Sequence, residues 1–225
     1  MKRIKLKDRE LPDYTRGEEI FNMVSHIVGG AFGIIALTGC VIKAFIKFDA
    51  YSIVAAFIYG FSMVILYTMS SVYHGLRPEK AKKVMQVLDH CTIFLLIAGT
   101  YTPISLVALR RANTALGWVI FGVVWGFSAL GITLNAIDLE KYNVFSMICY
   151  IVLGWCIVFP LKTAVRAIGV PGFLWLLAGG ISYTLGSVLY GVAGKKVHCY
   201  IHPVFHIFVV LGSILQFVCI FFYVI

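Results

Sequence analysis

Two histidines four residues apart, His202 and His206, have the spacing that most suggests chemistry in this sequence. On a helix an i, i+4 pair projects from one face, so both imidazoles can reach the same point. A third histidine, His74, and a lone acid, Asp89, also lie in apolar stretches. Three imidazoles with a fourth position left open are the ligand set of a catalytic zinc site. The competing interpretation is that these histidines cap backbone groups or pack singly.

The elements that carry these residues must be membrane helices, because the composition excludes a soluble fold. Of 225 residues, 60% are hydrophobic and 13% are charged, and the mean hydropathy is +0.92. A soluble domain carries about 25% charged residues. Disordered, collagen-like and disulfide-rich secreted chains are excluded by the same values. The net charge of +9 comes from the N-terminal tail and short connections, and no nucleic-acid-binding module is recognisable.

A bilayer core needs about 20 apolar residues as helix, and the chain contains seven such stretches. They are Ile20–Phe45, Tyr51–Gly75, Val84–Leu109, Ala115–Leu134, Val144–Leu161, Pro171–Ala193 and Cys199–Tyr223. The sequence therefore predicts an all-α membrane protein of seven transmembrane helices. Residues 1–17 form a basic tail and residues 18–225 the transmembrane domain. The connections, among them residues 76–83, 135–143 and 162–170, are too short for a second domain.

Basic residues predict the orientation of the chain. With a cytoplasmic N-terminus, thirteen Lys and Arg residues lie on the inner side and six on the outer side. Inner loops carry the excess of positive charge in membrane proteins. We therefore predict an N-terminus in the cytoplasm and a C-terminus outside.

This topology brings the unusual polar residues to one depth. His26 lies ~12 Å and Asp89 ~9 Å from the inner end of its span at 1.5 Å rise per residue. His74 ends a span that returns inward, and His202 and His206 begin the last span. An acid beside a metal need not bind it, and can instead hold the attacking water.

Other residues share these stretches. Ser70 precedes His74 by one turn, and Glu19, Asn22 and His26 form one stripe at i, i+3 and i+7. His90 and His198 are not predicted to be ligands. Glycine pairs such as Gly29/Gly33 and Gly122/Gly126 predict close helix contacts. No disulfide framework is predicted from Cys40, Cys91, Cys149, Cys156, Cys199 and Cys219.

The combination of motifs resembles the bacterial hemolysin III family, which is grouped with the progestin and adipoQ receptors and more distantly with the alkaline ceramidases. The matching segments are Glu-x2-Asn-x3-His from Glu19, Ser-x3-His from Ser70, Asp89-His90, and His-Pro-x2-His from His202. The resemblance covers nearly the whole chain from Glu19. The chain lacks the long N-terminal domain of the animal receptors, and its brevity suits the bacterial members.

The resemblance implies a seven-helix fold with zinc near the inner face. It implies His74, His202 and His206 as zinc ligands and Asp89 as the residue that holds the water. Ser70 would support this site or stabilise an oxyanion, and Glu19, Asn22 and His26 match a motif of undefined role. A multi-pass protein of a bacterial plasma membrane is expected.

Three functions are consistent with these residues. One is a zinc-dependent hydrolase of a membrane lipid, with an amide bond as a candidate target and substrate entry between helices. The second is a receptor or sensor with a structural zinc, and the third is a cytolytic hemolysin. A retinal protein is excluded because the last span has no lysine. The sequence leaves the substrate and the oligomeric state open.

Overall fold

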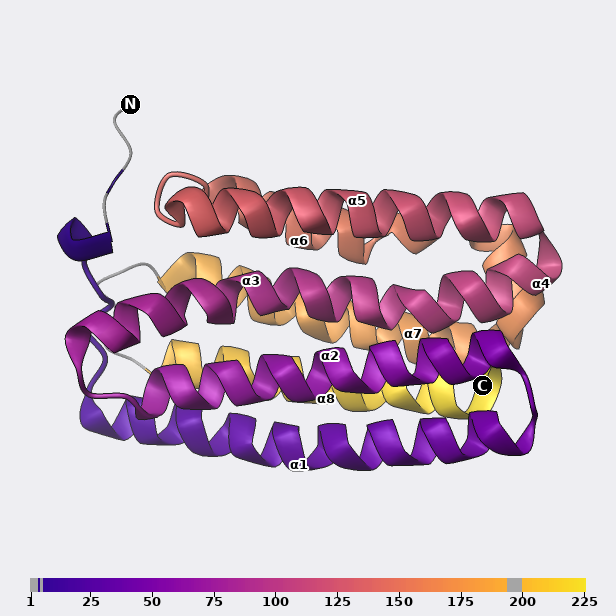
Figure 1. Cartoon of the computed structure of the whole chain (residues 1–225), viewed down its shortest axis with the longest axis horizontal. Coiled ribbons are helices and arrows are strands. Elements are labelled where there is room, and N and C mark those ends of the chain that lie inside the picture. Colours follow the sequence, from indigo (N-terminus) through magenta and orange to yellow (C-terminus); the bar gives the residue numbers. More distant parts are fainter. Residues whose placement is uncertain (1–3, 5, 194–199) are drawn as a thin grey trace.

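The computed structural model describes residue 4, residues 6–193 and residues 200–225, and throughout these residues the regular elements are helices. The chain runs back and forth along one axis as a bundle (Figure 1). The elements are η1 (Leu6–Asp8), α1 (Arg16–Ile46), α2 (Ala50–Gly75), α3 (Glu79–Pro103), η2 (Ile104–Leu109), α4 (Arg110–Ala112), α5 (Thr114–Asp138), α6 (Asn143–Gly154), η3 (Cys156–Val158), α7 (Leu161–Ala193), α8 (Ile201–Cys219) and η4 (Ile220–Val224).

Six helical stretches in the described part of the chain are long and apolar enough to cross a membrane. They are α1, α2, the continuous stretch Glu79–Ala112, α5, the part Leu161–Gly191 of α7 and the stretch Ile201–Val224. The predicted last span begins at Cys199, which lies outside the described residues. The remaining predicted span, Val144–Leu161, has no counterpart among these six. In its place the structure has a shorter apolar helical stretch, Asn143–Val158.

That shorter helix is interrupted by a tertiary contact. Helix α6 ends at Gly154, and a 3₁₀ turn follows it. The Tyr101 hydroxyl donates to the Gly154 carbonyl and accepts from the Ile157 amide, both at 2.9 Å. A buried side chain on α3 thus satisfies the backbone groups that the break leaves without helical partners.

Several predicted connections are shorter in the structure. The predicted connection over residues 162–170 is helical in the structure, because α7 begins at Leu161. The helix breaks at Gly169, where φ is +72°, and Pro171 follows. Buried Ala164 and Ile168 anchor this first part of α7. Similarly, α3 begins at Glu79 and α5 extends to Asp138.

Helix starts are set by local polar residues. Thr15 and Glu18 form a reciprocal capping box that starts α1 just before Glu19, which satisfies amides that have no helical acceptor. Asp49 caps α2 by accepting from the Ser52 amide. Asp49 also pairs with Arg111 at 2.6 Å. The hydrogen bond from the Ser52 hydroxyl, and to a smaller extent the charge of Arg111, holds the pKa of the Asp49 carboxyl below its ordinary value.

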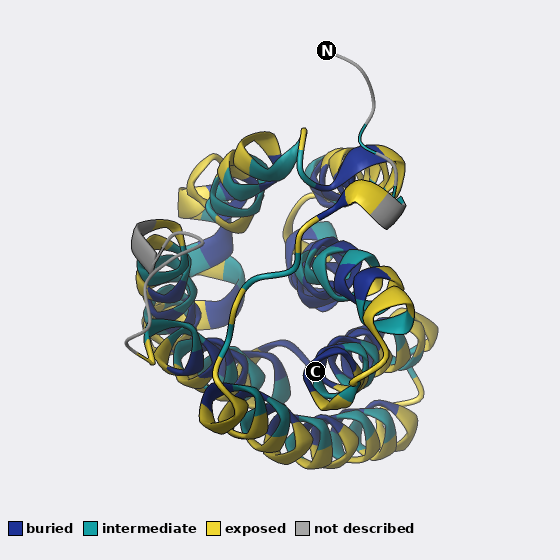
Figure 2. Ribbon diagram, turned by 90° about the vertical axis from the view of Figure 1, so that its left-hand side faces the viewer, coloured by how far each residue is buried: buried dark blue, intermediate teal, exposed yellow. Residues whose placement is uncertain are grey.

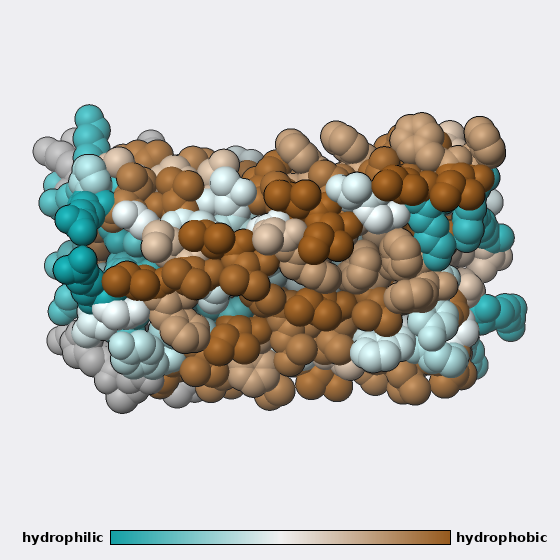
Figure 3. Space-filling view, turned by 90° about the horizontal axis from the view of Figure 1, so that it is seen from below, coloured by the Kyte–Doolittle hydropathy of each residue, from teal (hydrophilic) through white to brown (hydrophobic). Residues whose placement is uncertain are grey.

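The surface has the character of a membrane protein. Apolar residues cover most of the length of the bundle, and hydrophilic residues gather at its two ends (Figure 3). Along the axis, exposed positions face outward and buried ones face inward (Figure 2). Outward residues include large aliphatic side chains such as Ile35 and Val28, exposed by 64% and 59%. The five described cysteines, Cys40, Cys91, Cys149, Cys156 and Cys219, are free thiols.

Glycines allow α1 and α2 to approach closely. A Cβ on Gly29 would lie 2.7 Å from the Tyr67 ring, and one on Gly60 would lie 2.4 Å from Leu37 Cα. By contrast, a Cβ on Gly122 or Gly126 would meet nothing within 4 Å. The predicted contact at Gly29/Gly33 is therefore confirmed, and the prediction for Gly122/Gly126 is wrong.

We expect Gly60→Ala to destabilise the bundle, because the new methyl group would push the α1 backbone away from α2. Overpacking of this kind costs roughly 1–3 kcal/mol. The measurement is unfolding of the detergent-solubilised protein. Gly122→Ala is the matched control and should change the unfolding free energy by less than about 0.5 kcal/mol, as surface substitutions do. Equal effects of the two changes would contradict the packing assigned to Gly60.

Candidate metal centre

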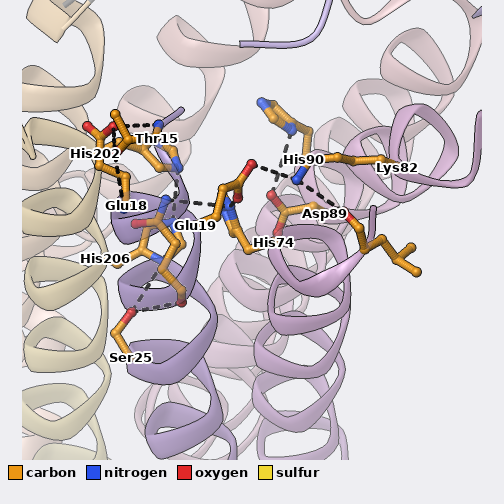
Figure 4. A network of polar contacts seen from close by, with 12 residues as sticks. Thr15, Glu18, Glu19, Ser25, His74, Lys82, Asp89, His90, His202 and His206 are labelled. Carbon is orange, nitrogen blue, oxygen red and sulfur yellow. Dashed lines mark hydrogen bonds and ion pairs between the residues drawn. The ribbon is translucent and has the colours of Figure 1, made fainter. Parts of the chain in front are cut away.

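Three histidines from two helices converge at one end of the bundle. His74 lies in the last turn of α2, and His202 and His206 lie in the first two turns of α8. One ligand atom from each lies within 4.8 Å of the others. The Nε2 atoms of His202 and His206 are 3.0 Å apart, and the side chains face one another in Figure 4. The predicted one-sided i, i+4 pair is thus joined by the third histidine.

The three imidazoles fit a zinc ion. His74 Nε2 is buried and lacks a hydrogen-bond partner among the described residues. A buried nitrogen without a partner is costly, and a metal would use its lone pair. Imidazole is a favoured zinc ligand, and three protein ligands leave a fourth position open. The type of ligand, the short distances between the three imidazoles and the unpartnered nitrogen are therefore all consistent with a zinc site.

Asp89 lies beside this group without belonging to it. Its side chain is 15% exposed, and Ser70, buried one turn before His74, makes a hydrogen bond to it. Its Oδ2 is 3.9 Å from His90 Nδ1. Ser70, Asp89, His202 and His206 line the same cavity, so Asp89 borders the space that two of the three histidines border.

The stripe on α1 contacts two of the three histidines. Glu19 Oε2 lies 2.6 Å from His74 Nδ1, and Asn22 Nδ2 lies 3.5 Å from the same atom. The ring of buried His26 stacks on His206 with 3.8 Å between centroids. Helix α1 therefore surrounds the group without adding an atom to it.

Two residues at the site were not predicted from the sequence. Tyr14, just before α1, stacks on His202 with 4.8 Å between ring centroids, and burial raises the pKa of its phenol above the ordinary value. Lys82 donates to Glu19 Oε1 at 2.6 Å. Their partners lie far away in the sequence, so no local spacing pointed to either residue.

The two histidines not expected to be ligands differ in what the structure describes. His90 Nδ1 lies 2.9 Å from the Gln86 carbonyl, and its Nε2 lies 3.3 Å from the Tyr190 hydroxyl. Both ring nitrogens are thus engaged outside the three-histidine group. His198 lies outside the described residues.

The site opens into an apolar cavity between helices. The cavity and its mouth hold about 1220 Å³ of empty space. Away from the polar residues, its walls are mainly apolar and include Ile93, Ile97, Met147 and Ile151 from α3 and α6. A second cavity shares Tyr101 and Trp155 with it. The apolar space therefore extends from the histidines toward the other end of the bundle.

Comparison with known proteins assigns the chain to a family. The sequence profile described as "Haemolysin-III related" matches residues 14–217. The chain belongs to this family. Among its relatives, this haemolysin-III protein is 37% identical over 207 residues to "Hemolysin-3" of Bacillus cereus, covering 92% of each chain. It is 34% identical over 210 residues to "Hemolysin-3 homolog" of Bacillus subtilis (strain 168), covering 93% of this chain and 96% of the relative.

A more distant relative is an animal protein. "Monocyte to macrophage differentiation factor" of Homo sapiens is 25% identical over 186 residues, which cover 79% of the haemolysin-III chain and 74% of the relative. The resemblance found from the motifs is confirmed by these matches. With the apolar helices, they identify a multi-pass membrane protein of a bacterial type.

Proposed function

We propose that this haemolysin-III protein is a zinc-dependent membrane hydrolase that acts on a lipid, with an amide as the bond cleaved. The observation that carries the proposal is the convergence of three imidazoles, one with an unpartnered buried nitrogen, at the edge of an apolar cavity that Asp89 also lines. We assign the metal-binding role to His74, His202 and His206.

The chemistry divides between the metal and the protein. When bound, zinc supplies a Lewis acid that polarises a carbonyl group and lowers the pKa of a water molecule. Asp89 would accept a proton from the attacking water, since it lines the cavity. The Ser70 hydroxyl would hold Asp89 in place through their hydrogen bond. Proton transfer by such a base contributes typically about 10²–10⁴-fold in rate.

The cavity favours an apolar substrate. Its histidines and its one acid gather at one end, and the rest is lined mainly by aliphatic and aromatic side chains, with Thr100, Thr184 and Gln216 among them. A lipid could therefore place its polar linkage at the histidines and its hydrocarbon chain along Ile93, Ile97 and Ile151. Membrane lipids are the partners we propose, with entry between the helices.

We further propose seven crossings with a cytoplasmic N-terminus and an external C-terminus. In support, η1 and the C-terminus lie at opposite ends of the bundle (Figure 1), as an odd number of crossings requires. The short helix α6 and the turn η3 would complete the count. The histidine group lies at the same end as η1, so this orientation places it near the cytoplasmic face.

Reporter fusions test this orientation. An alkaline-phosphatase fusion after Ile225 should be active, because the enzyme folds outside the cytoplasm, and a fluorescent protein there should be dark. We expect this result because thirteen basic residues lie on the proposed inner side and six on the outer side, and inner loops carry the excess of positive charge. An active phosphatase on a fusion in the loop before Glu79, with an inactive one after Ile225, would reverse the proposed orientation.

The decisive experiment measures metal and turnover together. The purified protein should contain about one zinc per chain and release free fatty acid from at least one lipid amide in a detergent-solubilised panel. Chelation should remove both, and added zinc should restore both. Full turnover by metal-free protein would contradict zinc dependence, and an identical background on every lipid would contradict hydrolysis.

One alternative has a specific observation in its favour. The histidines join the end of α2 to the start of α8, so zinc could act only by holding these helices together in a receptor. That protein would bind zinc and gain stability from it without turnover. Cytolysis has only the name of the Bacillus cereus relative, "Hemolysin-3", in its favour, and the mainly apolar cavity does not favour a water-filled pore.

A further inference from the structure

Glu19 bridges a proposed ligand and a lysine from another helix. Its Oε2 lies 2.6 Å from His74 Nδ1, and its Oε1 accepts from Lys82 Nζ at 2.6 Å. The His74 side chain is fully buried, and the side chains of Glu19 and Lys82 are 17% and 12% exposed. The three residues come from α1, α2 and α3, and Figure 4 shows Glu19 between the other two.

The contact determines which nitrogen of His74 carries the proton. A carboxylate can only accept hydrogen bonds, so at 2.6 Å the proton must lie on Nδ1. The Asn22 amide, at 3.5 Å from Nδ1, is at the limit of hydrogen bonding and does not compete. In the neutral imidazole, Nε2 then has the free lone pair, and it is the buried nitrogen without a partner.

Helix α1 also makes polar contacts with the His206 ring. The Asn22 backbone carbonyl accepts a hydrogen bond from His206, and the Ser25 hydroxyl lies 3.5 Å from His206 Nδ1. Its Nε2 points to the other side, toward His202 Nε2. One helix without a ligand of its own therefore contacts the Nδ1 atoms of two histidines of the group, which leaves their Nε2 atoms for a metal.

We propose that Glu19 is a positioning residue for the metal centre, which fixes the tautomer and ring orientation of His74 and is itself held by Lys82. This inference rests on the proposed metal centre, and it gives the α1 motif a role. A carboxylate hydrogen-bonded to a ligating imidazole also makes that imidazole donate its electron pair to the metal more strongly. Losing such a partner typically weakens metal affinity about 10–100-fold.

Lys82 contributes by fixing the carboxylate. Its ammonium group also donates to the Leu76 carbonyl at 3.3 Å and lies 5.3 Å from the Tyr73 ring centroid. These contacts tie the start of α3 to the end of α2, where His74 lies. Without Lys82, Glu19 keeps its hydrogen bond to His74 but loses one of its two anchors.

The test measures metal affinity with cobalt(II) and zinc, so it does not depend on turnover. Metal-free protein in detergent is titrated with cobalt(II), whose d–d absorption reports tetrahedral coordination, and zinc then displaces it. We expect Glu19→Ala to weaken zinc affinity about 100-fold and Glu19→Gln about 10-fold, because glutamine keeps an acceptor but loses the charge. Lys82→Met should weaken it by less than Glu19→Gln.

Glu79→Gln is the matched control, because Glu79 also pairs with a lysine at this end of the bundle, Lys83 at 2.6 Å, and its side chain is 73% exposed. This change should leave zinc affinity within about twofold of wild type. The nitrogen-15 shifts of His74 give a second readout: protonated Nδ1 in wild type, and a mixture of tautomers in Glu19→Ala.

Zinc affinity within twofold of wild type in both Glu19 variants would overturn the inference, as would an equal loss of affinity in Glu79→Gln. Glutamine is nearly isosteric with glutamate, so Glu19→Gln decides the matter if the alanine variant does not fold. Wild-type protein that binds zinc but hydrolyses no lipid would refute the proposed enzyme and leave the role of Glu19 standing. Wild-type protein without a cobalt band would refute the metal centre and this role together.

Discussion

Replacing His202 and His206 together with alanine is expected to abolish zinc binding. These residues provide two of the three imidazoles that approach within 4.8 Å of one another. His74 alone cannot hold the ion, because structural and catalytic zinc sites use at least three protein ligands. The measurement is zinc content per chain after purification and dialysis, and the double variant should retain essentially none.

The double variant should also be less stable than the wild type, because it no longer binds zinc. A ligand that binds only the folded form stabilises it by mass action, by about 4.1 kcal/mol at a thousand times its Kd. Added zinc should therefore raise the midpoint of thermal unfolding of wild-type protein and leave the double variant unchanged. His90→Ala is the control: His90 lines the same cavity but contacts Gln86 and Tyr190, so this variant should keep its zinc. A double variant with full zinc content would refute the ligand assignment.

Replacing Asp89 with asparagine should separate holding the metal from using it. Asparagine preserves the size of the side chain and removes the base. We expect Asp89→Asn to retain the fold and to lower lipid-amide hydrolysis by about 10²-fold or more, as general-base catalysis implies. The assay must contain excess zinc, because changes around a metal centre can weaken its affinity by roughly 10–100-fold. Ser70→Ala should lose less, because it removes one hydrogen bond to a base that remains.

A second carboxylate provides the control for this experiment. Asp49 caps α2 at the opposite end of the bundle and pairs with Arg111. Asp49→Asn should lower stability and leave the rate on the same lipid unchanged. If Asp89→Asn hydrolyses lipid at the wild-type rate with zinc bound, another group must activate the water, and the role assigned to Asp89 is wrong.

The sequence by itself determined the class of protein and the end of the bundle at which the polar residues meet. Its length and hydropathy leave only membrane helices, and the approximate position of each long helix follows from a run of apolar residues. Because consecutive spans run in opposite directions, residues such as His74 and His202 could be placed at one depth by counting. The i, i+4 spacing of His202 and His206 also fixed their common face, since it is a local property of one helix.

The tertiary structure decided what depends on contacts between distant residues. Glu19 meets His74 across 55 positions and Lys82 across 63, and the break after Gly154 depends on Tyr101 from another helix. The sequence also did not distinguish Gly60, against which α1 packs, from Gly122, which faces open space. Helical periodicity gives the face on which a residue lies, but not which neighbour that face meets, because that depends on how the helices pack together.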